Sequence, residues 1–134
     1  MQAVIYARSS GTPEFDQRSI RAQVTSAQRY AETNGLIVQR VFIDKGTGRQ
    51  RPMLAQAVDQ VSSGEAEILL VVDVTRISRC PAELAMYLAK MQGHGSITIT
   101  SLGINTASES GKFFAICLAD FHKLTTTHGN HRHD

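Results

Sequence analysis

An arginine and a serine lie two residues apart just after the first apolar segment of the chain, and this pair is the first candidate for chemistry. In the stretch VIYARSSG, residues 4–11, Arg8 and Ser10 share one face if the strand continues to residue 10, because side chains alternate along a strand. Ser9 then faces the other way. The planar fork of arginine suits phosphate recognition, and a serine hydroxyl can attack a phosphate ester. The alternative is a strand-to-loop turn in which a serine caps the backbone.

Three more arginines follow other apolar segments. Arg51 closes the stretch DKGTGRQR, residues 44–51, and Arg76 and Arg79 lie three residues apart in TRISR, residues 75–79. Taken singly, the first is typical of a flexible surface and the other two of a solvated face. Arginine nonetheless supplies most of the 14 positive side chains, and phosphate recognition favours its fork over the point charge of lysine.

Hydrophobic patterning predicts the elements that position these residues. Short runs rich in Val, Ile and Leu predict strands at residues 3–7, 36–43, 67–74 and 96–102. Helical spacing predicts helices at residues 19–34, 52–64 and 81–93, and a last one that follows Ser110 and Gly111. Gly35 is expected to cap the first helix, and Pro52 and Pro81 to open the next two.

The alternation of strands and helices predicts a three-layer α/β fold. Its sheet should be mainly parallel, with four to five strands, and flanked by helices. In such sheets ligands bind beyond the carboxyl ends of the strands. The stretches RSSG, DKGTGRQR and DVTRISR are therefore expected to meet at one rim of the sheet, although they lie far apart in the sequence.

Four motifs in this order resemble the catalytic domain of the serine recombinases, the resolvase and invertase family, over residues 2–121. They are Y-x-R-x-S, S-I-x-x-Q, D-x-G-x-G followed by R-P-x-L, and an R-x-S-R stretch after the third strand. The matching residues are Tyr6, Arg8, Ser10, Ser19, Ile20, Gln23, Asp44, Gly48, Arg51, Pro52, Leu54, Arg76, Ser78, Arg79, Glu83 and Gly111.

The resemblance implies site-specific DNA recombination without metal, ATP or any other cofactor. Ser10 would attack a phosphodiester to give a 5′-phosphoserine linkage and a free 3′ hydroxyl, which can reverse the attack. The implied catalytic residues are Tyr6, Arg8, Ser10, Gln23, Arg51, Arg76 and Arg79, and the four arginines are the implied phosphate-binding residues. Their fixed charges would stabilise the transition state. The implied partners are DNA and a second copy of the chain, as a homodimer or as a tetramer on DNA.

Three features depart from the family: Thr75, the last helix, and the lack of a recognisable DNA-binding domain. Many members carry an aspartate directly before the first arginine of the R-x-x-R pair, where this chain has Thr75. Asp73, expected two residues back on the same strand face, is a candidate substitute, either as general acid or as the carboxylate that orients the arginine; the alternative is that it only neutralises Arg76. The usual Glu-Arg pair of the last helix is also absent, and the threonines at 125–127 predict that this helix ends near Lys123.

Two polar residues of the first predicted helix have separate interpretations. Ser19 is predicted to be its N-cap rather than part of the chemistry. By resemblance, Gln23 helps to position the arginines or the phosphate, and the alternative is an ordinary surface glutamine.

Length and composition predict one folded domain, residues 1–124, with a polar His-rich tail, residues 125–134, that is expected to be disordered. Apolar residues make up 42% of the 134-residue chain and charged residues 19%, which is ordinary globular usage. The net charge of +2 does not identify a nucleic-acid binder by itself. His128, His131 and His133 suit either a metal ion or a disordered polar tail, and we favour the tail.

The remaining expectations concern redox state and compartment. Cys80 and Cys117 lie far apart and predict free thiols, with Cys117 buried. No apolar run approaches the roughly 20 residues that span a bilayer, so we expect a cytoplasmic protein without membrane contact.

Two other classes of function stay open. The chain could be a catalytically impaired or truncated recombinase remnant that serves as a dimerising or regulatory module. It could also be a flavodoxin-like phosphate or nucleotide binder, but the first loop, SSGTPEFDQRS, lacks the glycine-rich sequence of a phosphate cradle. No segment resembles a DNA-binding domain, so site recognition is expected to be absent or to come from another chain.

Overall fold

A computed structural model of the chain describes the backbone of residues 1–9, 13–46 and 50–131, and the side chains of these residues except 13, 15, 16 and 121–131. Ten elements follow in order: β1 (Gln2–Ser9), α1 (Pro13–Thr33), β2 (Ile37–Lys45), α2 (Pro52–Ser62), β3 (Ile68–Val71), the 3-10 turn η1 (Val74–Arg76), α3 (Pro81–Met91), β4 (Ser96–Ile99), β5 (Ile104–Asn105) and α4 (Glu109–His131). The predicted α/β class is confirmed.

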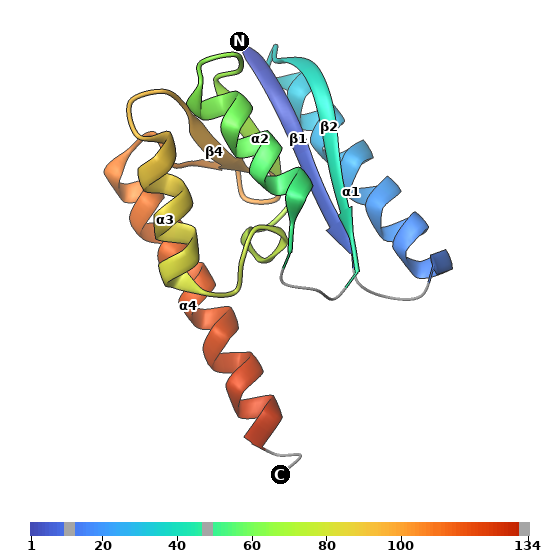
Figure 1. Cartoon of the computed structure of the whole chain (residues 1–134), viewed down its shortest axis with the longest axis vertical. Coiled ribbons are helices and arrows are strands. Elements are labelled where there is room, and N and C mark those ends of the chain that lie inside the picture. Colours follow the sequence, from blue (N-terminus) through green and yellow to red (C-terminus); the bar gives the residue numbers. More distant parts are fainter. Residues whose placement is uncertain (10–12, 47–49, 132–134) are drawn as a thin grey trace.

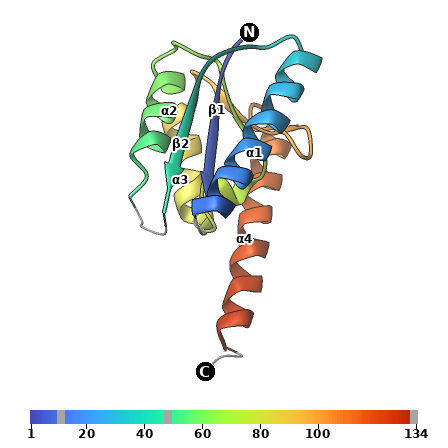
Figure 2. The same ribbon diagram turned by 90° about the vertical axis from the view of Figure 1, so that its right-hand side faces the viewer.

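The five strands form one sheet in the order β2-β1-β3-β4-β5, parallel except for the pairing of β4 with β5. Helix α1 covers one face, and α2, α3 and α4 cover the other (Figures 1 and 2). This three-layer arrangement buries both faces, which is why the central strands are almost continuously apolar.

Alternate residues of β1 serve two separate cores. Ala3 and Ile5 pack with Ala27 and Ala31 of α1. Val4 and Tyr6 point to the other face, where the core includes Leu54 of α2, Leu84 of α3 and Ala115 of α4. The face that carries Tyr6 is also the face of Arg8, so the alternation decides on which side of the sheet this arginine emerges.

The first helix begins earlier than predicted. It starts at Pro13, and Ser19 therefore lies inside α1, so the prediction that Ser19 is the N-cap was wrong. A proline in the first turn is a normal way to open a helix, because its missing N–H has no intrahelical partner to lose.

Two predictions about the sheet also need correction. The third strand ends at Val71 instead of residue 74, because Asp73 caps the turn η1, and Asp73 is therefore not a strand residue. The two-residue strand β5 went unpredicted, since so short a segment has no detectable periodicity.

The last helix differs from expectation in length and in one buried position. Its backbone is helical to His131 rather than to about Lys123. Threonine costs only about 0.7 kcal/mol or less per helical position, so three of them do not by themselves end a helix. Cys117 is exposed, which corrects the prediction of a buried thiol: Ala115 and Ala119 form the packed face of α4, and residue 117 lies on the other side.

No helix within the described part of the chain combines the length and apolar character needed to cross a membrane.

Candidate active site

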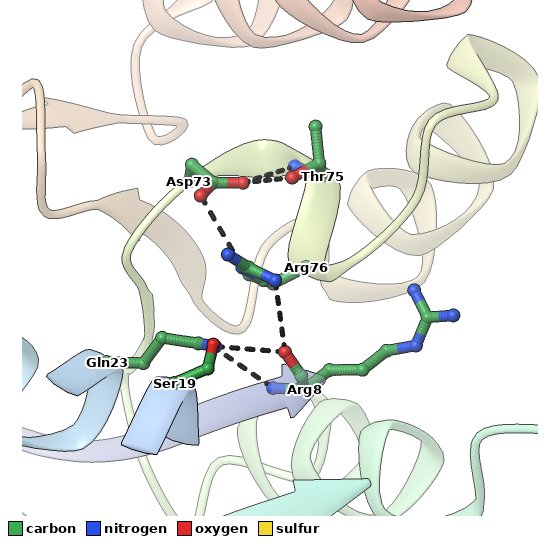
Figure 3. Close-up of polar contacts among 6 residues, drawn as sticks. All are labelled: Arg8, Ser19, Gln23, Asp73, Thr75 and Arg76. Carbon is green, nitrogen blue, oxygen red and sulfur yellow. Dashed lines mark hydrogen bonds and ion pairs between the residues drawn. The ribbon is translucent and has the colours of Figure 1, made fainter. Parts of the chain in front are cut away.

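At the carboxyl end of β1, the backbone groups on the side of β3 have no strand partner and are paired by a side chain instead. Strand β1 pairs with β2 as far as Ser9 but with β3 only at Ala3–Ile5. Beyond that point Gln23 of α1 takes the place of a strand: its Oε1 accepts the Arg8 N–H at 3.1 Å, and its Nε2 donates to the Arg8 carbonyl at 2.9 Å and to Ser19 Oγ at 3.1 Å (Figure 3). The buried Gln23 thus fixes the backbone that carries Arg8.

The start of α2 is fixed by a buried carboxylate at the end of β2. Asp44 accepts the Met53 N–H at 3.1 Å, the Leu54 N–H at 3.0 Å and the Tyr6 hydroxyl at 2.8 Å. These contacts satisfy two otherwise unpaired donors at the helix N-terminus, where negative charge is also favoured. Because Arg51 is the residue just before α2, Asp44 also fixes the point from which the Arg51 side chain extends.

Arg51 connects three segments of the rim. Its Nη1 donates to the Ile77 carbonyl and lies 3.5 Å from Glu83 Oε1 in the first turn of α3. The side chain is only 16% exposed, and its buried Nε has no hydrogen-bond partner among the described residues. The guanidinium is therefore held between the loop that precedes α3 and α3 itself.

Arg76 lies between Asp73 and the backbone of Arg8 (Figure 3). Its Nη1 donates to the Arg8 carbonyl at 3.2 Å, and its Nε lies 3.5 Å from Asp73 Oδ2. The Nε atom has no hydrogen-bond partner among the described residues, so this contact is an ion pair only. The same aspartate accepts two donors from Thr75, the N–H at 3.0 Å and the hydroxyl.

Arg8 is electrostatically coupled to the other three predicted arginines. Burial lowers the pKa of the Arg8 guanidinium, and repulsion from Arg51, then from Arg79 and Arg76, lowers it further, whereas Tyr6 opposes the shift. Arg8 at the end of β1 is therefore within electrostatic range of arginines from the start of α2 and from the segment after β3, and Arg76 also contacts the Arg8 backbone. Such a concentration of positive charge suits the binding of an anion that contacts several of them.

The other predicted site residues have varied positions. Ser10 lies outside the described residues. Arg79 is exposed on the rim, whereas Tyr6 is completely buried, and its hydroxyl is taken by Asp44 rather than turned toward the arginines. Burial, followed by the hydrogen bond to Asp44, raises the pKa of Tyr6, so the phenol stays protonated.

Sequence reasoning matched Asp44 and Glu83 to the family but assigned them no place in the site. An acidic residue in the first turn of a helix, as Glu83 is in α3, was the available signal for a partner of a nearby arginine. The histidines of the tail fall beyond the described side chains. Among the side chains that are described, no three His, Cys, Asp or Glu residues gather as metal ligands.

The amino-acid sequence itself matches one protein family over almost its full length. The model of the family described as "Resolvase, N terminal domain" matches residues 3–132. The chain belongs to this family.

Several solved structures share the fold of this resolvase domain. A resolvase family site-specific recombinase from Streptococcus pneumoniae aligns with a TM-score of 0.74 at 18% identity, over 98% of this chain and 94% of the other. The N-terminal catalytic domain of TP901-1 integrase gives 0.68 at 21% identity, over 95% and 98%. The C-terminal catalytic domain of ISC1926 TnpA, an IS607-like serine recombinase, gives 0.63 at 21% identity, over 75% and 70%. At these identities the likeness shows a shared fold.

Proposed function

We propose that this resolvase domain cuts and rejoins DNA through Ser10, without metal or ATP. In the proposed step Ser10 Oγ forms a bond to a backbone phosphorus, the bond from phosphorus to the 3′ oxygen breaks, the serine proton is released and the 3′ oxygen is protonated. The phosphoserine ester keeps the bond energy. A 3′ hydroxyl can therefore attack it and restore a DNA strand, with Ser10 as the leaving group.

The observation that supports this proposal is the electrostatic coupling of Arg8, at the end of β1, to Arg51, Arg76 and Arg79, together with the contact of Arg76 with the Arg8 carbonyl. Negative charge spreads over the phosphoryl oxygens in the transition state, and preorganised cations stabilise it most where they need not move. The Arg51 guanidinium is largely buried and is held by the Ile77 carbonyl and Glu83. Arg8 is partly buried, and Gln23 holds its backbone. Ser10 follows Arg8 by two residues, which brings the nucleophile into the same segment.

The roles we propose follow from these positions. Arg8, Arg51, Arg76 and Arg79 bind the phosphate. Gln23 and Tyr6 are positioning residues that do not contact the phosphate: Gln23 holds the Arg8 backbone, and Tyr6 holds Asp44. The partner is DNA, and a second copy of the chain supplies the other strand cut.

The test is a covalent adduct. The protein is incubated with a supercoiled plasmid library of random inserts, with EDTA present, and denatured complexes are searched for DNA joined to protein. We expect an adduct whose DNA-linked peptide is modified at Ser10, and none from Ser10→Ala. A folded wild-type protein without adduct, or an adduct formed by Ser10→Ala, would contradict the proposal and favour a non-catalytic interaction module.

A paired arginine substitution tests the charge cluster separately. Arg51→Gln is expected to lower the rate of adduct formation by about 100- to 1,000-fold, the usual effect of removing one preorganised donor to a transition state. Arg40→Gln is the matched control, because Arg40 lies on β2 over the Phe42 ring, at 4.7 Å from its centroid, and belongs to no contact of the rim. Equal rates for the two variants would remove Arg51 from the site.

A further inference from the structure

Thr75 and Asp73 form a small hydrogen-bonded unit directly before Arg76. Asp73 has extended backbone and caps the turn η1, and its Oδ1 accepts both the N–H and the hydroxyl of Thr75. With Oδ1 occupied twice by one residue, the rotation of the carboxylate is fixed. Its second oxygen, Oδ2, is the one that lies 3.5 Å from Arg76 Nε (Figure 3).

Arg76 is thereby held at two points of its guanidinium. Asp73 lies beside Nε, and Nη1 donates to the Arg8 carbonyl at 3.2 Å. The Arg8 carbonyl also accepts from Gln23, so the contact joins the turn η1 to the end of β1. No described residue accepts a hydrogen bond from Nη2, which leaves that nitrogen as the free end of the fork.

We infer that Asp73, held by Thr75, is a positioning residue that aims Arg76 at the scissile phosphate and is not the proton donor of the reaction. The inference rests on the proposed function, and it identifies Asp73 and Thr75 as the residues that orient Arg76, one of the four proposed phosphate-binding arginines. Oδ1 accepts two hydrogen bonds from Thr75, and Oδ2 lies beside the Arg76 guanidinium, so both carboxylate oxygens face protein groups. Positioning Arg76 should matter for the reaction rate, because a displacement of about 1 Å in a catalytic group can lower the rate about 100-fold.

Substitutions at the Asp73–Arg76 ion pair can change the position of Arg76 with little change in the stability of the domain. Asp73 and Arg76 are 36% and 33% exposed, and ion pairs at such exposure contribute little to the free energy of unfolding. Asp73→Asn keeps an oxygen that can accept from Thr75 but removes the charge beside Arg76. Thr75→Val keeps the shape and the backbone donor but removes the hydroxyl.

We expect Asp73→Asn to lower the rate of Ser10 adduct formation at saturating DNA by about 10- to 100-fold, with a smaller change in the DNA concentration at half-saturation. Thr75→Val should lower the rate by a smaller factor in the same direction. Asp59→Asn is the control, because it removes the same charge from a surface pair, Asp59 with Lys90 at 2.6 Å, outside the rim. Wild-type rates in Asp73→Asn, or an equal loss in Asp59→Asn, would overturn the inference.

A second readout does not depend on DNA. The Nε–H resonance of Arg76, assigned by its loss in Arg76→Lys, should exchange with solvent several-fold faster in Asp73→Asn and in Thr75→Val than in the wild type. A slow rate of adduct formation with unchanged Nε–H exchange would assign Asp73 to proton transfer and overturn the positioning role. A wild-type protein without any adduct contradicts the proposed function instead, and the exchange measurement still decides how Arg76 is held.

Discussion

At the scale of single residues, Asp44 is a buried carboxylate that holds parts of the fold together. It is 7% exposed and meets three donors, the Tyr6 hydroxyl and the N–H groups of Met53 and Leu54. A carboxylate at such burial is tolerated only when its oxygens are hydrogen-bonded, and removing one donor leaves a buried acceptor without its partner, which costs free energy of folding. Asp44 therefore ties β1, β2 and α2 together beneath the arginines.

Tyr6 makes the stability of the domain depend on alkaline pH. Its pKa is raised by burial first and by Asp44 next, whereas a tyrosine in the unfolded chain ionises near pH 10. Above that pH the unfolded chain loses a proton that the folded domain keeps, so the free energy of unfolding falls by up to about 1.4 kcal/mol per pH unit. Urea unfolding between about pH 9 and pH 11 measures this slope.

Tyr6→Phe should be less stable at neutral pH by about 1–3 kcal/mol, because Asp44 loses a donor, and its stability should fall less steeply above pH 10. Tyr30→Phe is the control, since the Tyr30 hydroxyl has no hydrogen-bond partner among the described residues and the ring is half-buried on α1. The same alkaline slope in the wild type and in Tyr6→Phe would show that Tyr6 ionises in the folded domain.

At the scale of elements, the first turn of α4 lies close against β5. A Cβ atom added at Gly111 would lie 2.0 Å from the Asn105 carbonyl oxygen, which is far below van der Waals contact. Glycine therefore lets the first turn of α4 lie against the edge strand. The packing of α4 begins at this residue and continues through Ala115 and Ala119.

Gly111→Ala should destabilise the domain by about 1–3 kcal/mol, because either the helix or the strand has to move. Ser110→Ala is the matched control: it adds no atom, it lies one residue away at an exposed position, and it is expected to change stability by less than about 0.5 kcal/mol. Thermal and urea unfolding report both. A neutral Gly111→Ala would mean that the contact between α4 and β5 relaxes without cost.

Long periodic segments of this chain were predictable and short capped ones were not. The strands of residues 3–7 and 36–43 and the helices that open at Pro52 and Pro81 follow from apolar spacing and proline placement, and the structure confirms them to within about two residues. The end of β3 depended instead on Asp73 bonding its own neighbours, which competes with strand structure locally. The early start of α1 depended on Pro13, which the same local rules also allow in a turn.

The common location of the predicted arginines could be argued from the sequence, but the contacts that hold them could not. Because parallel strands end at one edge, arginines after three separate strands were expected to meet there, and the electrostatic coupling of Arg8 to Arg51, Arg76 and Arg79 agrees with that expectation. The use of Gln23 as a substitute strand was not predictable. It requires that β3 stop short beside β1, a feature of tertiary structure that no local pattern records.

At the scale of the whole molecule, α4 extends past the body of the domain at the same end as the carboxyl ends of β1 and β2 (Figure 1). Phe113 and Phe114 on this helix are 71% and 48% exposed, and Leu102 in the turn between β4 and β5 is 55% exposed. Adjacent exposed aromatic side chains are typical of a surface that another protein covers. A cavity of about 630 Å³, lined in part by Leu88, Met91 and Lys112, lies apart from the rim arginines, none of which lines it.

We predict that the chain forms a homodimer in solution through the surface of α4 that carries Phe113 and Phe114. Phe113→Ser combined with Phe114→Ser should shift sedimentation toward the monomer, with at least a tenfold weaker association if each ring contributes about 1 kcal/mol or more. Ile37→Ser is the control, because Ile37 is similarly exposed, at 59%, but lies on β2. Dimers of unchanged strength in the double variant would place the contact elsewhere, and a monomeric wild type would contradict the prediction.

The hydrogen bonds between the Arg8 backbone and the Gln23 side chain have a consequence for the order in which the domain folds and the candidate site forms. The last residues of β1 remain an unfinished edge until α1 has settled on the sheet, since the amide that completes them is carried by that helix. Only from then on does the backbone aim the Arg8 guanidinium and offer Arg76 its acceptor. A chain whose sheet has formed but whose helix α1 has not yet docked would thus have most of its fold and no ordered candidate site.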